Sequence, residues 1–150
     1  MTIYLGGDHA GFDLKEELEG LLLRENYTVH DLGNTTFDAE DDYPDYADAV
    51  AKAVMKNQAF RGILLCGSAE GVCIAANKTA GIRAAIGFSE EAARLARTDE
   101  NANILCLPAR LMNFDEAARI VRVFLTTKFS GAVRHRRRIN KIADIEAQDD

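Results

Sequence analysis

Residues 61–71, Arg61-Gly62-Ile63-Leu64-Leu65-Cys66-Gly67-Ser68-Ala69-Glu70-Gly71, decide the fold class of this 150-residue chain. From Ile63 to Cys66 every side chain is apolar, as is typical of a strand that is covered on both faces. Residues 104–107 (Ile-Leu-Cys-Leu) repeat this pattern. The small residues after Cys66 predict a sharp turn into a helix that begins at Glu70. A buried strand followed by a tight turn and a helix indicates a parallel β/α unit.

Outward from this segment, short strand-like runs alternate with longer segments of helical period. The predicted strands are residues 2–7, 27–32, 61–66, 82–87 and 103–107. The predicted helices are residues 12–25, 46–56, 70–78, 90–97, 114–127 and, at the C-terminus, about 132–147, with an acidic loop at 33–45. This alternation predicts an α/β fold: a three-layer α/β/α, doubly wound, Rossmann-like sheet of five parallel strands with a C-terminal helix. No repeat or linker interrupts it, so residues 1–150 are expected to form one domain.

Composition excludes several classes of protein. The chain is 47% hydrophobic and 28% charged, as expected for a globular protein, and its net charge of −6 argues against a general nucleic-acid binder. No apolar run approaches the roughly 20 residues that span a bilayer, and the N-terminus lacks the basic start of a signal peptide. None of the three cysteines lies in a C-x-x-C pair, which favours a reducing cytoplasm and argues against structural zinc. No metal-ligand spacing, dinucleotide fingerprint or Walker motif is present, so we expect neither a metal nor a cofactor.

Cys66 is the first candidate for chemistry, because ligands of such folds bind beyond the carboxyl ends of the strands. The turn of residues 67–71 leaves backbone N–H groups available to a ligand, and the helix that follows adds its positive end. Such a field favours the thiolate and would place a base beside a cradle for an anion. The alternative is that Cys66 is only a buried strand residue, as we expect for Cys106, while Cys73 is expected to serve packing.

Other polar groups are candidates for the same site. Asp8 and His9 follow the first strand and either bind sugar hydroxyls or phosphate, or simply form a turn. Arg134 and Arg138 lie four residues apart on one helix face, so they either grip one phosphate or form a solvated basic face. Arg110, just after the fifth strand, favours the phosphate interpretation. In the acidic loop, residues 38–45, most acids are expected to be solvated, while Tyr43 is a candidate wall for a sugar site.

These pieces together resemble the family of ribose-5-phosphate isomerase B and galactose-6-phosphate isomerase, along nearly the whole chain. The matching segments are Gly7-Asp8-His9-Ala10-Gly11-Phe12, Asp42-Tyr43-Pro44, Cys66-Gly67-Ser68, Ile74-Ala75-Ala76-Asn77-Lys78, Gly81-Ile82-Arg83-Ala84, Asn101-Ala102-Asn103, Arg110, and Arg134-His135 with Arg138. Each match is weak alone, but their joint occurrence in this order is specific.

The resemblance implies an aldose–ketose isomerase of a phosphorylated sugar. Cys66 would move a proton between C1 and C2 through a cis-enediol, while Ser68 and the backbone of residues 67–71 (Gly67, Ala69, Glu70 and Gly71) would hold the enediolate oxygen. The phosphate ligands would be His9, Arg110, Arg134 and Arg138, with Asp8 on hydroxyls and Tyr43 against the sugar. Family members form homodimers or larger assemblies such as homotetramers with composite active sites, so some of these residues are expected to serve a neighbouring subunit.

The chain departs from the family pattern in two regions. The usual loop has a third glycine where this chain has Ala69, most often followed by an aliphatic residue rather than Glu70. Family members that act on ribose 5-phosphate usually carry His and then Asn where Asp99 and Glu100 stand, and that His is assigned to opening the sugar ring. A carboxylate can also take a hydroxyl proton, so Asp99 is the candidate replacement, although imidazole is better matched to neutral pH. Otherwise the substrate opens spontaneously or is a different sugar phosphate.

Three hypotheses follow from the sequence. The leading one is isomerisation of ribose 5-phosphate to ribulose 5-phosphate. The second keeps the chemistry on a hexose 6-phosphate or tetrose 4-phosphate, since the galactose-6-phosphate branch also lacks the ring-opening His. The third is a non-catalytic protein that binds a sugar phosphate.

Overall fold

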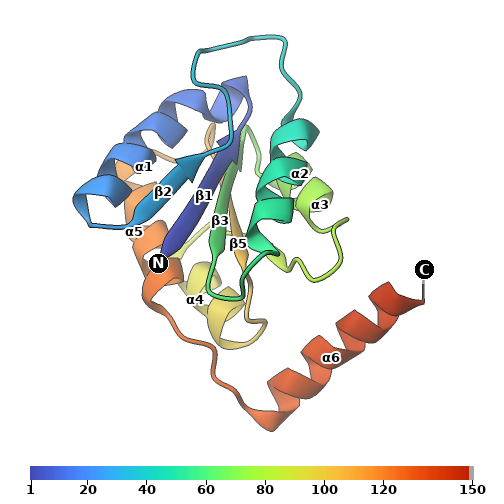
Figure 1. The fold of residues 1–150 in the computed structure, drawn as a ribbon. Coiled ribbons are helices and arrows are strands. Elements are labelled where there is room, and N and C mark those ends of the chain that lie inside the picture. Colours follow the sequence, from blue (N-terminus) through green and yellow to red (C-terminus); the bar gives the residue numbers. More distant parts are fainter. Residues whose placement is uncertain (149–150) are drawn as a thin grey trace.

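The sheet has five parallel strands in the order β2-β1-β3-β5-β4 in a computed structural model that describes residues 1–148 (Figure 1). The strands are β1 (Thr2–Gly7), β2 (Thr28–Asp31), β3 (Arg61–Cys66), β4 (Ala84–Ile86) and β5 (Ile104–Pro108). The chain adds β2 on one side of β1 and then crosses over to build β3, β5 and β4 on the other side. This is the doubly wound parallel sheet that the sequence predicts, so the fold class is confirmed.

Helices cover both faces of the sheet and make three layers. One layer contains α1 (Phe12–Arg24), α4 (Glu90–Thr98) and α5 (Phe114–Thr126), and the other contains α2 (Tyr43–Val54) and α3 (Glu70–Ala76). Successive side chains of β3 enter different cores: Ile63 and Leu65 pack in the first, Leu64 and Cys66 in the second. Because both faces of the strand are buried, β3 is apolar throughout rather than alternating.

Near the carboxyl edge of the sheet, the structure moves one predicted element boundary and adds one short element. α2 begins at Tyr43, three residues earlier than the predicted Tyr46. Pro44 lies in its first turn, where a missing N–H and a fixed φ are favourable rather than disruptive, so the proline starts the helix. A short 3₁₀ turn, η1 (His9–Gly11), precedes α1, and the Asp8 carboxylate caps it by accepting hydrogen bonds from the N–H groups of Ala10 and Gly11.

The C-terminal helix, α6 (Val133–Ala147), projects away from the three layers (Figure 1). His135 is its only buried residue among those described, whereas Val133 and Ile145 are 79% and 62% exposed. Near its end, the Glu146 carboxylate accepts hydrogen bonds from the Gly81 N–H at 3.1 and 3.2 Å. The helix therefore presents apolar side chains that its own chain covers little. Within residues 1–148, no helix is both long enough and apolar enough to cross a bilayer.

Candidate active site

Cys66 ends the central strand β3, where the carboxyl edge of the sheet meets the loops. Its side chain is 4% exposed, and it pairs in register with Pro108 of β5. Cys106, two residues before Pro108, lies wholly inside the core, and burial raises the pKa of its thiol well above the ordinary value. Cys66 instead lies directly before the turn of residues 67–71. Of these two strand cysteines, only Cys66 is placed next to a ligand-binding edge.

The turn after Cys66 brings free backbone donors together. Ala69 adopts a left-handed conformation with φ 68°, and α3 begins at the next residue. Within residues 1–148, the N–H groups of Gly67, Ser68 and Ala69 donate to no other residue, while the Ser68 hydroxyl accepts from the Glu70 N–H at 3.4 Å. Such a row of backbone donors suits an anionic oxygen. Left-handed backbone costs a non-glycine residue about 1–2 kcal/mol, which gives a physical reason why a glycine suits position 69.

Two side chains lie against the glycines of this turn. The Arg110 side chain lies so close to Gly67 that a Cβ there would be 3.1 Å from both Cδ and Nη1. The Tyr43 ring lies against Gly71, where a Cβ would be 2.5 Å from Cζ. The absence of side chains at both glycines therefore lets a cation and an aromatic ring close in on the turn. Tyr43 and Arg110 therefore both lie against the turn that follows Cys66, and their contacts with a sugar phosphate stay predictions.

His9 belongs to the same edge and is held by the acidic loop. Its backbone N–H donates to Asp41 Oδ1 at 2.9 Å, and its ring Nδ1 is 2.8 Å from the same oxygen. The hydrogen bond to Asp41 raises the pKa of His9, while the nearby positive charge of Arg110 opposes the rise. Burial alone would raise the pKa of Asp41, but the bonds from His9 outweigh it and the pKa is lowered. The pair therefore favours a protonated imidazole close to Arg110.

Asp41 is a site residue that the sequence does not single out. It stands in a run of acids, residues 38–45, that differ little in their sequence surroundings, yet its side chain is only 5% exposed. It holds His9, and its second oxygen accepts from the Asn34 side chain at 3.0 Å. Asp8, predicted to contact sugar hydroxyls, uses its Oδ1 atom to cap η1. Its capping role explains its position, and its contact with a sugar stays a prediction.

Four predicted site residues lie away from Cys66 in this chain. Asp99 and Glu100 follow α4, at the amino ends of β4 and β5, where the Glu100 carbonyl accepts from the Arg83 side chain. β5 has five residues, so the two edges of the sheet are separated by about 16 Å at roughly 3.3 Å per residue. Arg134 and Arg138 are exposed on the projecting helix α6. The chain alone therefore brings together Cys66, His9, Tyr43 and Arg110, but not these four.

Near Asp99, a contact with His135 links the end of α4 to α6. His135 Nε2 lies 3.7 Å from Asp99 Oδ1, and its Nδ1 is hydrogen-bonded to the Ser130 hydroxyl at 2.7 Å. The Thr98 hydroxyl also donates to Asp99 Oδ1. Asp99 is thus held at the base of α6, 39% exposed, on the same part of the molecule as Arg134.

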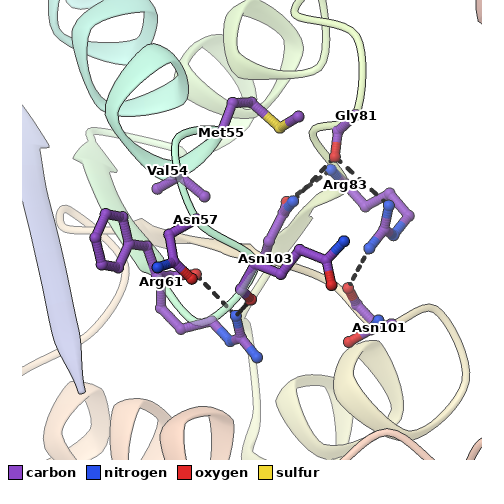
Figure 2. A pocket seen from close by; sticks show the side chains of 10 residues that line it. Val54, Met55, Asn57, Arg61, Gly81, Arg83, Asn101 and Asn103 are labelled. Carbon is purple, nitrogen blue, oxygen red and sulfur yellow. Dashed lines mark hydrogen bonds between the residues drawn. The ribbon is translucent and has the colours of Figure 1, made fainter.

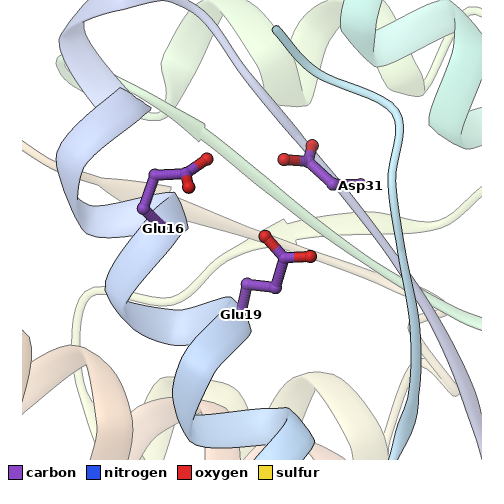
Figure 3. Close-up of side chains that lie close together, drawn as sticks. All are labelled: Glu16, Glu19 and Asp31. Atoms are coloured by element: carbon purple, nitrogen blue, oxygen red, sulfur yellow. The ribbon is translucent and has the colours of Figure 1, made fainter. Parts of the chain in front are cut away.

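A group of three carboxylates outside this site has the spacing of metal ligands. Oxygens of Glu16, Glu19 and Asp31 all lie within 4.8 Å of one another (Figure 3). The Lys15 ammonium is already among them: it pairs with Asp31, donates to Glu16 at 3.0 Å, and donates to the Asn34 carbonyl at 3.1 Å. Burial and the neighbouring acids raise the pKa of Glu19. The ammonium takes the place that a cation would need, so the group is a structural ion pair.

Replacing Lys15 with methionine is expected to lower the free energy of unfolding by about 3–5 kcal/mol, because it leaves the Asp31 carboxylate without its positively charged partner. The Lys15 side chain is fully buried and Asp31 is 10% exposed. Urea unfolding followed by circular dichroism measures the loss. The matched control is Lys52→Met, which breaks an exposed pair with Asp48 and should cost about 0.5 kcal/mol or less. Equal effects in the two variants would show that the Lys15 pair does not stabilise the fold.

The fold has three layers around one parallel sheet, and the carboxyl edge of that sheet carries a thiol, free backbone donors, His9 and Arg110. This arrangement is typical of α/β enzymes that act on small anionic substrates. The sequence pattern of the ribose/galactose isomerase family matches residues 3–142. The chain belongs to this family.

Relatives and solved structures agree with this assignment. A probable ribose-5-phosphate isomerase B of Mycoplasma genitalium is 46% identical, with 98% of this chain and 97% of the relative covered. Ribose-5-phosphate isomerase B of Mycolicibacterium paratuberculosis is 42% identical, with 97% and 92% covered. The crystal structure of the M. genitalium enzyme with bound ribulose 5-phosphate has a TM-score of 0.94 at 46% identity, covering 97% of this chain and 96% of that one. A ribose 5-phosphate isomerase of Thermotoga maritima has a TM-score of 0.91 at 47% identity, with 95% and 97% covered.

Proposed function

We propose that this protein interconverts ribose 5-phosphate and ribulose 5-phosphate, with Cys66 as the base. The observation that carries the proposal is the convergence of Cys66, the free N–H groups of residues 67–69, Arg110 and His9, whose pKa is raised by its bond to Asp41, at one edge of the sheet. Relatives named ribose-5-phosphate isomerase B, and one structure that holds ribulose 5-phosphate, support the choice of substrate.

The chemistry requires a base and an anion cradle in the same place. Cys66 as thiolate would take the proton from C2 of the open-chain aldose, and the electron pair would move to the C1 oxygen to form a cis-enediolate. The N–H groups of Gly67, Ser68 and Ala69 would stabilise that oxygen, which makes removal of a carbon-bound proton feasible. The Cys66 thiol would then return its proton to C1 while the hydroxyl proton on O2 moves to O1, so that O2 becomes the carbonyl oxygen of the ketose and the thiolate is regenerated. Arg110 and His9 would anchor the phosphate.

The remaining ligands would come from a second copy of this chain in a homodimer or a larger assembly such as a homotetramer. The positions of Asp99, Glu100, Arg134 and Arg138, at the amino edge of the sheet or on α6, support a role at the thiol of a neighbouring subunit. A groove of about 380 Å³ lies between α6 and the edge strand β4, lined in part by Ile82, Ile142 and Ile145. This apolar groove and the few contacts of α6 with its own chain support the proposal that α6 packs against a second subunit.

The identity of the ring-opening group bears on which sugar phosphate is the substrate. Asp99 would act as its acid–base group from the partner subunit. A hexose 6-phosphate or a tetrose 4-phosphate is the alternative substrate, motivated by the Asp99-Glu100 departure. A non-catalytic protein that binds a sugar phosphate is the third hypothesis. We also propose a cytoplasmic location, supported by three free cysteines.

A panel of aldose phosphates with four, five and six carbons tests the substrate. We expect kcat/KM to be highest for ribose 5-phosphate, by about tenfold or more, since one extra or missing carbon changes binding by about 1–3 kcal/mol. A clear preference for a six-carbon substrate would move the function to the galactose branch. If the folded protein turned over no member of the panel, only the hypothesis of a non-catalytic sugar-phosphate-binding protein would remain.

Replacing Asp41 with asparagine is expected to shift the pH dependence of KM. The Asp41 hydrogen bond raises the pKa of His9, so the imidazolium form, and its contribution to phosphate binding and to stability, is complete below the unfolded pKa of about 6.5 and is lost as pH rises through the folded value. KM should therefore rise by roughly tenfold across that range, the worth of one charge-assisted hydrogen bond. In Asp41→Asn the same rise should begin at lower pH, with kcat little changed.

Initial rates between pH 5.5 and 9 measure this shift. Titration of the substrate phosphate affects both proteins equally, so their difference reports on His9. Asp42→Asn is the matched control, because the Asp42 side chain makes no capping hydrogen bond and its removal leaves the His9–Asp41 pair intact. Superimposable KM profiles for wild type and Asp41→Asn would contradict the assignment of His9 as a phosphate ligand.

A further inference from the structure

A second polar pocket lies at the amino ends of the strands, at the opposite edge of the sheet from Cys66 (Figure 2). Its volume is about 390 Å³. Arg61, the first residue of β3, and Arg83, just before β4, line it together with an apolar wall of Val54, Met55 and Phe60. Four side-chain amides complete its lining: Asn57, Gln58, Asn101 and Asn103. A pocket with two cations, several amides and one apolar wall has the make-up of a small-molecule site.

The two arginines of the pocket contact only neutral acceptors. Arg61 Nη1 donates to the carbonyls of Gln58 and Phe60, both at 2.8 Å. Arg83 donates to the carbonyls of Glu100 at 2.8 Å, Asn101 at 2.9 Å and Gly81 at 3.5 Å. Within residues 1–148, neither makes a salt bridge. Each guanidinium has five N–H donors, so both keep donors for a ligand.

A third arginine lies behind them and adds to the positive field. Arg97 is 4% exposed, and its Nη1 donates to Asn101 Oδ1 at 2.9 Å. Burial, and then the charges of Arg61 and Arg83, lower the pKa of Arg97 to about 10, so it stays charged at neutral pH. Burial and Arg83 also lower the pKa of Arg61. Burial lowers the pKa of Arg83, and two carboxylates, Glu146 and Glu100, lie close enough to oppose this shift. The Glu146 carboxylate already accepts a hydrogen bond from the Gly81 N–H.

We propose that this pocket binds a phosphate monoester, with Arg61 and Arg83 gripping the phosphate and the rim amides contacting the rest of the molecule. Guanidinium groups bind phosphate oxygens in pairs, and a dianion between the two would offset the repulsion among three neighbouring cations. Gln58 and Asn57 lie on the exposed side of the pocket, where they can meet hydroxyl groups. The site is separate from the carboxyl edge and lies beyond the isomerase activity.

Titration of ¹⁵N-labelled protein with inorganic phosphate tests the proposal, followed by the Nε–Hε signals of the arginine side chains. The signals of Arg61 and Arg83 should shift and saturate together. They should do so with the same affinity in Arg110→Ala, which weakens the proposed active site, so the two sites are distinguished. Loss of the shifts in Arg110→Ala, or no shift at millimolar phosphate in wild type, would overturn the proposal.

Two variants weaken the pocket in different ways. Asn57→Asp keeps the oxygen that accepts from the Ala59 N–H at 2.9 Å but adds a negative charge beside Arg61. Arg61→Gln removes a cation. Each should weaken phosphate binding at this site by about tenfold, the worth of one charge-assisted hydrogen bond, while turnover in phosphate-free buffer stays unchanged. Arg119→Gln, an exposed position on α5, is the control and should leave the affinity unaltered. Unchanged affinity in both pocket variants would overturn the proposal.

Discussion

Replacing Cys66 with alanine is expected to lower kcat for ribose 5-phosphate by about 10³-fold, the usual worth of a positioned general base. The thiol ends the central strand and precedes three backbone N–H groups without a partner in residues 1–148. No histidine replaces it locally, because the ring of His9 is committed through Nδ1 to Asp41. The substrate would still bind through Arg110 and His9, so KM should change much less than kcat.

Cys106→Ala is the matched control for this prediction. It removes a thiol from the neighbouring strand, in the same core, and should leave kcat within about twofold while costing about 1 kcal/mol of stability through lost packing. Circular dichroism and urea unfolding confirm that both variants fold. Equal losses of kcat in the two folded variants would mean that the base is another group.

Two inactive variants are expected to restore each other's activity when they share one dimer. The first is Cys66→Ala, and the second carries Arg134→Ala together with Arg138→Ala. If α6 of one subunit completes the site of its partner, the mixed dimer has one site with both an intact thiol and an intact pair of arginines. A two-fold dimer holds two equivalent sites, so the mixed species should show about half of the wild-type activity.

Co-expression with two different tags isolates the mixed dimer for assay. The control pairs Cys66→Ala with a chain that carries all three substitutions, in which no site is intact and activity should be absent. If Arg134 and Arg138 instead served the thiol of their own chain, neither mixture would regain activity. Such a result would contradict the composite site, and it would leave the fold and the role of Cys66 untouched.

The parallel sheet was predictable because burial on both faces leaves a direct mark on the sequence. Ile63 and Leu65 enter one core and Leu64 and Cys66 the other, so no polar residue is tolerated in that stretch. The start of α2 was predicted three residues late, since Pro44 looks like a helix breaker unless it lies in the first turn. Boundaries of this kind depend on the local backbone conformation rather than on periodicity.

The site was only partly predictable, because several of its contacts join residues that lie far apart in the sequence. Cys66 ends a strand, and His9 and Arg110 each come just after one. Parallel strands end at one edge, so the convergence of the three residues follows from topology. Asp41 was not singled out, because nothing in an acidic run shows which carboxylate reaches a histidine 32 residues away. The place of Asp99 and the two α6 arginines also needed the structure, since the sequence does not show which edge of the sheet a helix end approaches.

Hydrogen exchange at the substrate carbon tests the role of Cys66 most directly. Ribulose 5-phosphate, which has no closed ring form to open because its O5 is esterified, is incubated in D₂O with enzyme and followed by ¹H NMR. Wild type should replace the exchangeable C1 proton with deuterium, and folded Cys66→Ala should leave it in place over the same period, while Cys106→Ala exchanges as wild type does. Exchange at the wild-type rate in Cys66→Ala would contradict the assignment of this thiol as the group that moves the proton.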